Sequence, residues 1–504
     1  MSLTFEQLED RLLLTTTVTQ KGTLLNIVGD SGPDSIVVSG DGGPGRIAVD
    51  FDGIAGDDAQ FFGIKSILIS TGGGNAQLTV EDAVQITGNL NIFIGDEDAD
   101  IKVRNGVRIG DSLGIRTGVG ALATTIENDV LIGNDLSVLK GSGPSTTTVQ
   151  NGVTIGDDFT IALKDGNAVN TIQDGVFIGD NLSIRTGSGA HTTSVKTNVQ
   201  IGNNLSLLLG AGNSGTSIRD GVKIGDSVSL RGGSGAKVVE FQTDVSIGND
   251  LAIRFGDGDS NIRVADEAVI GDDLNIQVGV GDVTVFVGAN SSVGDNVAIR
   301  SRGGDSDVNV VGGVTIGNDL TIITGNGMSD TDVLNDISIG DDLTIISGGD
   351  NDNIEIGVDV LVGDNLVVKT GDGEDIVGVS GGVNVLDNAS IDTGAANDMV
   401  YVEDAGVGGN VILSTGLGND MVDVGNTPAG GAGASGDVII GGSTSVNVGP
   451  GTDTLEVTNT VTDGPVTLNG GRFGEGDTLT LQFSTLQFRI DPVLKNWDFV
   501  VVIS

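Results

Sequence analysis

The sequence predicts an all-β protein, a three-sided parallel β-helix (β-solenoid) with about 23 residues per coil. First, a tract of the form V-x-I-G-[DN]-[DNS]-L-x-I recurs along the chain at a fixed interval of 23 residues. Second, apolar residues alternate within this tract, which is typical of short strands and not of helices. Third, glycine numbers 84, proline only 7, and aromatic residues make up 3%, which suits a narrow core of aliphatic side chains. We expect each strand to pair in parallel with its equivalents in the neighbouring coils, in a right-handed helix.

The repeat also predicts the core and the corners of each coil. The repeated glycine stands at Gly110, Gly133, Gly156, Gly179, Gly202, Gly225, Gly248, Gly271, Gly294, Gly317, Gly340 and Gly363. The apolar positions of one repeat are Val107, Ile109, Leu113, Ile115 and Ile126. Because residues two apart on a strand share a face, these should point into the core, and Arg108 outward. The tracts V-x-I and L-x-I and a weaker third one predict three strands, separated by G-[DN], T-G-x-G and [ND]-G corners.

Regularity of the repeat divides the chain into five parts. Residues 1–17 are interpreted as a terminal motif or short capping helix, and residues 18–63 as irregular first coils. The regular solenoid should span residues 64–424, followed by a loop rich in Gly, Ala and Pro at residues 425–436. Residues 437–504 contain strand-like tracts, which we interpret as a cap or an assembly element.

Charge and composition exclude several classes of function. The formal net charge is -45, from 69 acidic and 24 basic residues, so we expect no nucleic-acid partner. The chain has no cysteine, which excludes disulfides and thiolate metal sites. It has no run of 18 apolar residues, so we expect no transmembrane segment.

The first residues resemble a surface-protein motif. Phe5, Glu6, Leu8, Glu9, Arg11, Leu12 and Leu13 match the pattern F-E-x-L-E-x-R-x-L-L. This pattern opens many planctomycete cell-surface and secreted proteins, and the chain is similar to them over about ten residues. The resemblance implies an extracellular or cell-surface location.

Several loops at the second corner resemble the calcium-binding nonapeptide of RTX proteins, G-G-x-G-x-D-x-U-x. They are T-G-D-G-E-D-I-V at 370–377, T-G-L-G-N-D-M-V at 415–422 and V-G-P-G-T-D-T-L at 448–455. In RTX proteins the motif recurs every nine residues, whereas this chain has one such loop per coil. The resemblance implies Ca²⁺ as a cofactor.

Acidic residues concentrate in these loops in the later coils. Oxygen ligands on glycine-rich loops suit Ca²⁺. The predicted metal ligands are Asp350, Asp352, Asp372, Asp375, Asp398 and Asp420. A second column, which begins with Asp111 and Asn134 at the first corner, has two interpretations: turn residues that accept backbone N–H groups, with Asn relieving the repulsion between Asp side chains, or an ion ladder.

Basic residues share a different column. Its members are Arg116, Arg185, Arg231, Arg254, Arg300 and Lys369. We expect them to offset the acidic ladders or to make contacts between neighbouring molecules, and a substrate-binding stripe is the weaker alternative.

These observations favour a secreted structural or surface protein that associates with itself, by end-to-end or lateral contacts, into a fibre, sheet or matrix. The first alternative is a calcium-dependent adhesin that contacts a cell surface or glycan, and the second is a polysaccharide-acting β-helix enzyme. We expect no enzyme, because sugar subsites usually stack on aromatic rings and the chain has one Trp and one Tyr. The sole histidine, His191, has no partner suggested by its spacing, and acidic pairs that recur in every coil are better explained by turns than by a unique acid and base.

Overall fold

The structure, a computed structural model, describes residues 16–50, 59–425, 437–471, 476–482, 487–488 and 492–503. These residues form strands and turns and contain no helix, and so no helix that could cross a membrane. The prediction of a three-sheeted parallel β-solenoid with coils about 23 residues apart is confirmed. The terminal motif with its capping helix and the Gly/Ala/Pro-rich loop lie, apart from a few flanking residues, outside the described residues.

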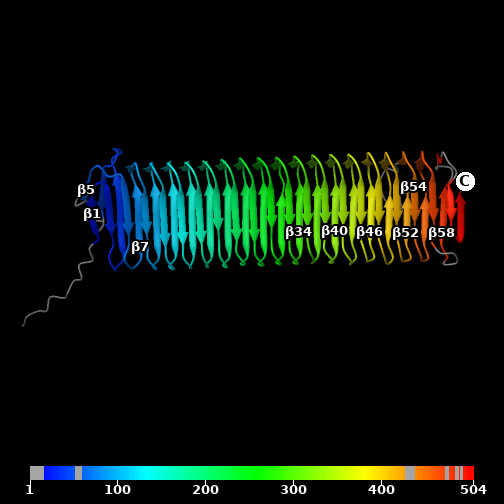
Figure 1. The fold of residues 1–504 in the computed structure, drawn as a ribbon, viewed down its shortest axis with the longest axis horizontal. Coiled ribbons are helices and arrows are strands. Elements are labelled where there is room, and N and C mark those ends of the chain that lie inside the picture. The colour runs from blue at the N-terminus through cyan, green and yellow to red at the C-terminus, as the bar shows by residue number, and fades with distance from the viewer. Residues whose placement is uncertain are drawn as a thin grey trace, which may run out of the picture. The chain divides into compact units, whose positions relative to one another are not determined.

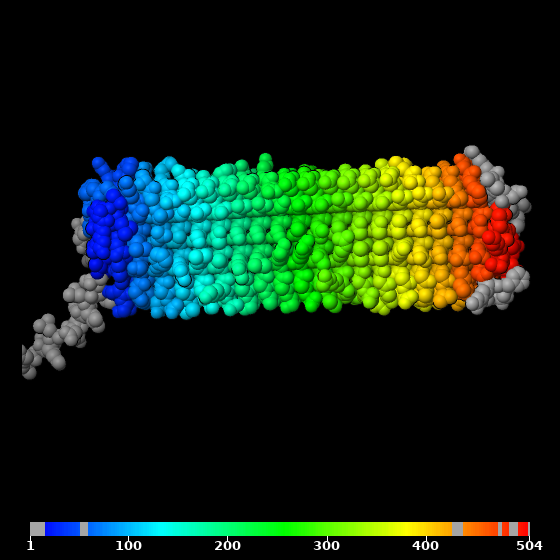
Figure 2. All heavy atoms as spheres, viewed as in Figure 1, coloured from blue at the N-terminus to red at the C-terminus, as the bar shows by residue number. Residues whose placement is uncertain are grey.

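The chain divides into two compact units. Unit 1 consists of Met1–Ser194 and Asn198–Gly202, and unit 2 consists of Val195–Thr197 and Asn203–Ser504. In each unit the strands lie in three sheets, which we name A, B and C, and neighbouring strands of a sheet lie side by side (Figure 1). Figure 2 shows the outward-facing side chains of successive coils as regular rows.

One coil of unit 1 shows how the chain passes through the three sheets. In chain order its strands are β11 (Arg108–Ile109) of sheet C, β12 (Leu113–Thr117) of sheet A and β13 (Leu122–Glu127) of sheet B. The first corner joins sheets C and A, the second joins A and B, and the third joins B back to C. The next coil repeats the order with β14 (Leu131–Ile132), β15 (Leu136–Lys140) and β16 (Ser145–Gln150). Each pair is parallel and partners are 23 residues apart, as in Leu113 with Leu136, so the sequence period is the strand register.

In unit 2 the later strands carry the sites described below. Those of sheet B include β34 (Val283–Gly288), β37 (Ser306–Val311), β40 (Ser329–Leu334), β43 (Asn353–Gly357), β46 (Ile376–Ser380), β49 (Met399–Val402), β52 (Met421–Val424), β55 (Thr454–Val457), β58 (Thr478–Gln482) and β61 (Phe499–Ile503). Those of sheet A include β45 (Leu366–Lys369), β48 (Ala389–Asp392), β51 (Val411–Ser414), β54 (Thr444–Asn447), β57 (Val466–Asn469) and β60 (Val493–Lys495). Every pairing along these two series is parallel.

The predicted core is confirmed. The five apolar positions of the repeat, from Val107 to Ile126, are each at most 1% exposed, and Arg108 is exposed. The lengths of the strands differ from the expectation. The V-x-I strand has only two residues, whereas the third strand, expected to be the weaker one, has six. In unit 1 the inward positions of these sheet B strands include Thr124, Thr147 and Asn170, all buried. Their polarity conceals the alternating pattern in the sequence.

The close approach of the backbones of stacked coils explains why glycine recurs at the first corner. A Cβ atom on Gly156 would lie 1.9 Å from the carbonyl oxygen of Gly133, so stacked coils leave room for hydrogen only. Between the acids of this corner the Asn134 side chain donates to Asp111 at 2.6 Å, and Asn249 donates to Asp226 at 2.6 Å. The backbone bonds are made one residue later, where Asp158 Oδ1 accepts the N–H of Asn181 at 3.1 Å. Asn therefore relieves the repulsion between the acids of this column, as the turn interpretation expects, whereas in these contacts the backbone N–H groups are accepted by the residue that follows and not by the column itself.

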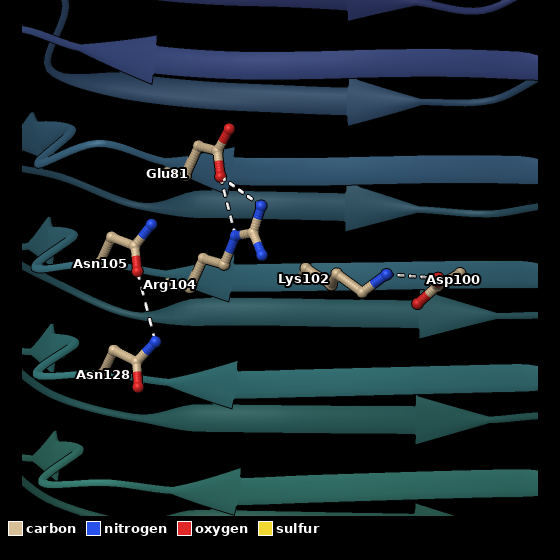
Figure 3. Close-up of polar contacts among 6 residues, drawn as sticks. All are labelled: Glu81, Asp100, Lys102, Arg104, Asn105 and Asn128. Atoms are coloured by element: carbon tan, nitrogen blue, oxygen red, sulfur yellow. Dashed lines mark hydrogen bonds and ion pairs between the residues drawn. The ribbon is translucent and has the colours of Figure 1, made fainter.

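Polar contacts also follow the stack on the outer face of unit 1 (Figure 3). At the third corner Asn128 adopts the left-handed conformation (φ 61°) and its side chain donates to Asn105 at 3.3 Å. On the strands, Arg104 forms an ion pair with Glu81 at 2.7 Å across neighbouring coils. Such partly exposed pairs contribute about 0–1 kcal/mol, so they adjust the surface and do not determine the fold.

The first and last described strands differ from the central coils. In unit 1, β1 (Thr17–Lys21) pairs antiparallel with β2 (Leu24–Val28), and β4 (Ile47–Asp50) pairs antiparallel with β3 (Asp34–Gly40). In unit 2, Leu494 of β60 is in register with Leu468, and Val500 of β61 with Leu479. The two partners are 1% and 0% exposed, whereas Leu494 and Val500 are 40% and 46% exposed. Inward-facing apolar side chains thus remain in contact with solvent at this end of unit 2.

Candidate functional site

Aspartates of unit 2 lie in one inward-facing column at the second corner, at the start of the sheet B strands. Each stands at the end of a glycine-containing loop from a sheet A strand, as in the loop between β45 and β46. In that loop Gly371 and Gly373 have φ of 100° and 141°, backbone angles that residues other than glycine rarely adopt. The following strand then turns the aspartate side chain inward. The members of this column, hereafter the aspartate column, are Asp352, Asp375, Asp398, Asp420, Asp453 and Asp477.

Hydrogen bonds link the aspartate column from coil to coil. Oδ1 of Asp352 accepts the backbone N–H of Ser329 at 2.8 Å, and Oδ1 of Asp375 accepts that of Asp352 at 2.8 Å. The same bond recurs from Asp375 to Asp398 at 3.0 Å, and from Asp398 to Asp420 at 2.9 Å. The chain of bonds continues through Asp453 at 2.8 Å and Asp477 at 3.1 Å. Each carboxylate therefore satisfies a backbone donor that the turn would otherwise leave buried.

The second carboxylate oxygens are less well satisfied. Oδ2 of Asp398 accepts the hydroxyl of Thr393 at 2.7 Å. Oδ2 of Asp352, Asp375 and Asp420 is buried and meets no donor at full hydrogen-bond geometry among the described residues, although the hydroxyls of Ser347, Thr370 and Thr415 lie close enough to lower the pKa of these carboxyl groups. The residues themselves are at most 2% exposed, so these oxygens are shielded from bulk solvent. Buried anionic oxygens of this kind favour a proton or a cation.

Burial changes the acidity of the aspartate column. It raises the pKa of Asp352 to about 6, and the neighbouring Asp375 acts in the same direction. Burial likewise raises the pKa of Asp398 to about 6, reinforced by Asp375 and Asp420. The pKa values of Asp375 and Asp420 are raised for the same first reason. These side chains therefore release their protons less readily than ordinary surface aspartates.

The structure separates the six predicted metal ligands into two groups. Asp352, Asp375, Asp398 and Asp420 lie in the aspartate column, whereas Asp350 and Asp372 are exposed on the outside of the corner. Asp453 and Asp477 were not among the predicted ligands. The V-G-P-G-T-D tract at 448–453 could have indicated Asp453, because it resembles the other loops of this corner.

A cation at this corner would have a limited set of ligands. Within the described ranges no group of three or more His, Cys, Asp or Glu side chains is close enough to hold a metal. A cation in the column would have fewer than three carboxylate ligands among these residues and would need carbonyl oxygens of the loops to complete its coordination. Oxygen donors and unpaired buried Oδ2 atoms fit Ca²⁺, which accepts six to eight such ligands in flexible geometry.

Other ionisable groups are buried at the second corner of their own units. In unit 1, Lys140 donates to the carbonyls of Gly118 at 2.6 Å and Ser142 at 2.8 Å. In unit 2, Lys237 is 1% exposed and donates to Gly212 at 2.9 Å and Gly235 at 2.6 Å. Burial lowers the pKa of both ammonium groups. Nothing in the sequence pattern marked these lysines as buried.

An open groove of about 660 Å³ runs along the outside of this corner in unit 2. Asp259, Asp282 and Asp305 line it, and each accepts the backbone N–H of the next coil, at 3.2, 3.0 and 3.2 Å. Because these acids recur with the coil and are bonded to the backbone, they act as turn supports. None of these contacts singles out an acid and base pair.

The two residues considered for sugar chemistry have structural contacts. A Cβ atom on Gly378 would lie 2.3 Å from the ring of Tyr401, so the tyrosine covers the gap left by this glycine on sheet B. His191 is 3% exposed, with Nε2 3.1 Å from the carbonyl oxygen of Gly187. Comparison with protein-family models, with curated proteins and with solved structures finds no match to this chain.

Proposed function

We propose that the chain is an extracellular or cell-surface structural protein, without catalytic activity, that associates with itself through the ends of its solenoid. The observation that supports this most is the apolar layer formed by Leu494 and Val500, which face inward and remain 40% and 46% exposed. Among the described residues β61 pairs with β58 alone, and β1 pairs with β2 alone. Unpaired strand edges next to exposed core residues favour addition of another strand.

In the proposed assembly the last coil of one copy meets the first strands of the next copy. The regular outer surface and the net charge of -45 disfavour lateral association, because like charges repel between parallel faces. Association would then be directed to the ends. Recurrence of the same acids and turns in coil after coil also favours a structural role over a single catalytic centre.

Sedimentation velocity of the full chain tests this proposal. We expect species larger than the monomer, and a monomer for the double variant Leu494→Lys/Val500→Lys, because two ammonium groups would have to be buried at the joint. The matched control is Val119→Lys/Val169→Lys, which places the same charges at positions 54% and 45% exposed in unit 1. A strictly monomeric wild type at all calcium concentrations would count against end association.

A calcium-dependent adhesin is the second candidate, and the buried Oδ2 atoms of the aspartate column favour it. Calcium bound there would support the second-corner loops, whose outer residues would be free to contact a cell surface or a glycan. Calorimetric titration with Ca²⁺, followed by binding to glycan arrays with and without chelator, separates the two candidates. Saturable Ca²⁺ binding with calcium-dependent glycan capture supports the adhesin, and Ca²⁺ binding without capture supports a structural cation.

A further inference from the structure

Arginines converge on a cleft at the second corner of unit 2. The cleft has a volume of about 370 Å³ and is lined by Arg231, Arg254 and Arg302 together with three glycines, Phe255, Asp257, Gln277 and Val278. Arg231 belongs to β27 (Val228–Gly232) and Arg254 ends β30 (Leu251–Arg254), and the two are register partners on adjacent strands. Arg302 reaches the cleft from the corner that follows β36 (Val297–Arg300).

The guanidinium groups in this cleft belong to exposed residues and have no protein partner within the part of the chain that the structure describes. Among the described residues, neither a hydrogen bond nor an ion pair involves the side chains of Arg231, Arg254 or Arg302. This is unexpected in a chain with 69 acidic and 24 basic residues. The carboxylate in the lining, Asp257, has its Oδ1 3.3 Å from the N–H of Val280, which it accepts. Three cations and one anion leave an excess of two positive charges facing the cleft.

The repeat does not require a cation at the position of Arg302. The residues 23 positions before and after it are Gly279 and Gly325. Arginine here replaces the glycine of neighbouring coils, so it makes no contribution to the turn that glycine cannot make. Its side chain adds a third guanidinium to a site whose floor is formed by Gly256 and Gly279.

The buried ammonium group of Lys237 lies close to the lining of this cleft. A Cβ atom on Gly232 would meet Cε of Lys237 at 2.5 Å, so the lysine stem packs beneath this glycine of the lining. The ammonium group is bonded to backbone carbonyls and has no carboxylate partner among the described residues. Its positive charge adds to the potential at the cleft in a medium that screens it less than water does.

We propose that this cleft binds a tetrahedral oxyanion, a phosphate or sulfate group, between Arg231, Arg254 and Arg302. A doubly charged anion matches the two excess positive charges. Arg231 and Arg254 stand side by side on adjacent strands and Arg302 comes from a corner, so together they can donate to more than two oxygens of one ligand, which a tetrahedral group offers and a carboxylate does not. Arginine is the side chain best suited to bind such oxygens because its fork donates two parallel hydrogen bonds. The site does not depend on self-association of the chain.

The oxyanion could be free or carried as an ester on a sugar, and titration calorimetry of the full chain distinguishes the two. The probes are inorganic phosphate, inorganic sulfate, glucose 6-phosphate and a sulfated oligosaccharide. Preference for the inorganic ions indicates a free ligand, and at least tenfold tighter binding of an ester indicates that the cleft recognises the carrier as well.

Variants locate the binding. Arg302→Gly introduces the residue that neighbouring coils already carry, and Arg254→Gln alters an exposed side chain, so both should fold as the wild type does, which circular dichroism checks. Each should weaken binding about tenfold or more, as expected for the loss of one charged hydrogen-bond donor. The control is Arg116→Gln, an exposed arginine of sheet A in unit 1 that does not line the cleft. Absence of saturable binding to all four probes, or equal losses in the control and the cleft variants, would overturn the proposal. So would a change in sedimentation without anion binding, which would point to an acidic face of a second copy.

Discussion

The aspartate column should make unit 2 more stable in mildly acidic solution than at neutral pH. Asp352 and Asp398 have pKa values of about 6 in the folded chain, against an ordinary value of 3.8. The folded state therefore binds these protons more tightly than the unfolded state does. As the pH rises from about 4 through 6, the free energy of unfolding decreases, and the decrease is complete above the folded pKa. A shift of about 2 units corresponds to roughly 3 kcal/mol for each group.

Denaturant unfolding followed by the fluorescence of Trp497 measures this effect, since the only tryptophan of the chain belongs to unit 2. The variant Asp352→Asn/Asp398→Asn keeps an oxygen for each backbone N–H but cannot ionise. We expect it to show a smaller stability change between pH 5 and pH 7.5 than the wild type, the remainder coming from Asp332, Asp375 and Asp420, whose pKa values burial also raises. The control Asp350→Asn/Asp372→Asn removes the same two charges from exposed positions and should keep the wild-type pH dependence. Equal pH dependence of the two double variants would refute the reasoning.

Three further predictions concern backbone strain and burial, each measured as the change in the free energy of unfolding. Ala396 has φ of 106° where the neighbouring coils carry glycine, so Ala396→Gly should stabilise the chain by about 1 kcal/mol, and destabilisation would contradict the strain. Both side-chain polar atoms of Asn170 are buried without partners among the described residues, so Asn170→Val should stabilise by about 1–3 kcal/mol, and a loss of stability would indicate a missing partner. A Cβ atom on Gly317 would lie 1.8 Å from a carbonyl oxygen, whereas a Cβ atom on Gly349 would meet no atom within 4 Å. Gly317→Ala should therefore lower the free energy of unfolding by about 3 kcal/mol and Gly349→Ala should change it little. Similar losses for the two variants would contradict the close stacking.

The coil was predictable from sequence because its period is also its register. Alternation in V-x-I and L-x-I places Leu113 and Ile115 on one face, and stacking at 23 residues then aligns them with their equivalents. The length of the sheet B strands could not be predicted in the same way. Their inward positions include Thr147 and Asn170, whose polarity imitates an exposed face.

The candidate site was predictable in part. The T-G-x-G-x-D pattern indicates Asp375 and Asp420, but spacing alone does not show that the final aspartate turns inward while Asp372 stays outside. That difference depends on where the loop ends and the strand begins. The cleft was missed because Arg302 lies outside the column of Arg254 and Arg300, and only the fold brings it to the same lining as Arg254.

We propose above that copies of this chain join through the ends of the solenoid. Electron microscopy of the purified full chain at neutral pH, beside the Leu494→Lys/Val500→Lys variant, tests it most directly. We expect end-joined copies for the wild type and single copies for the variant. Single copies in both preparations, or the same joined copies in both, would contradict it.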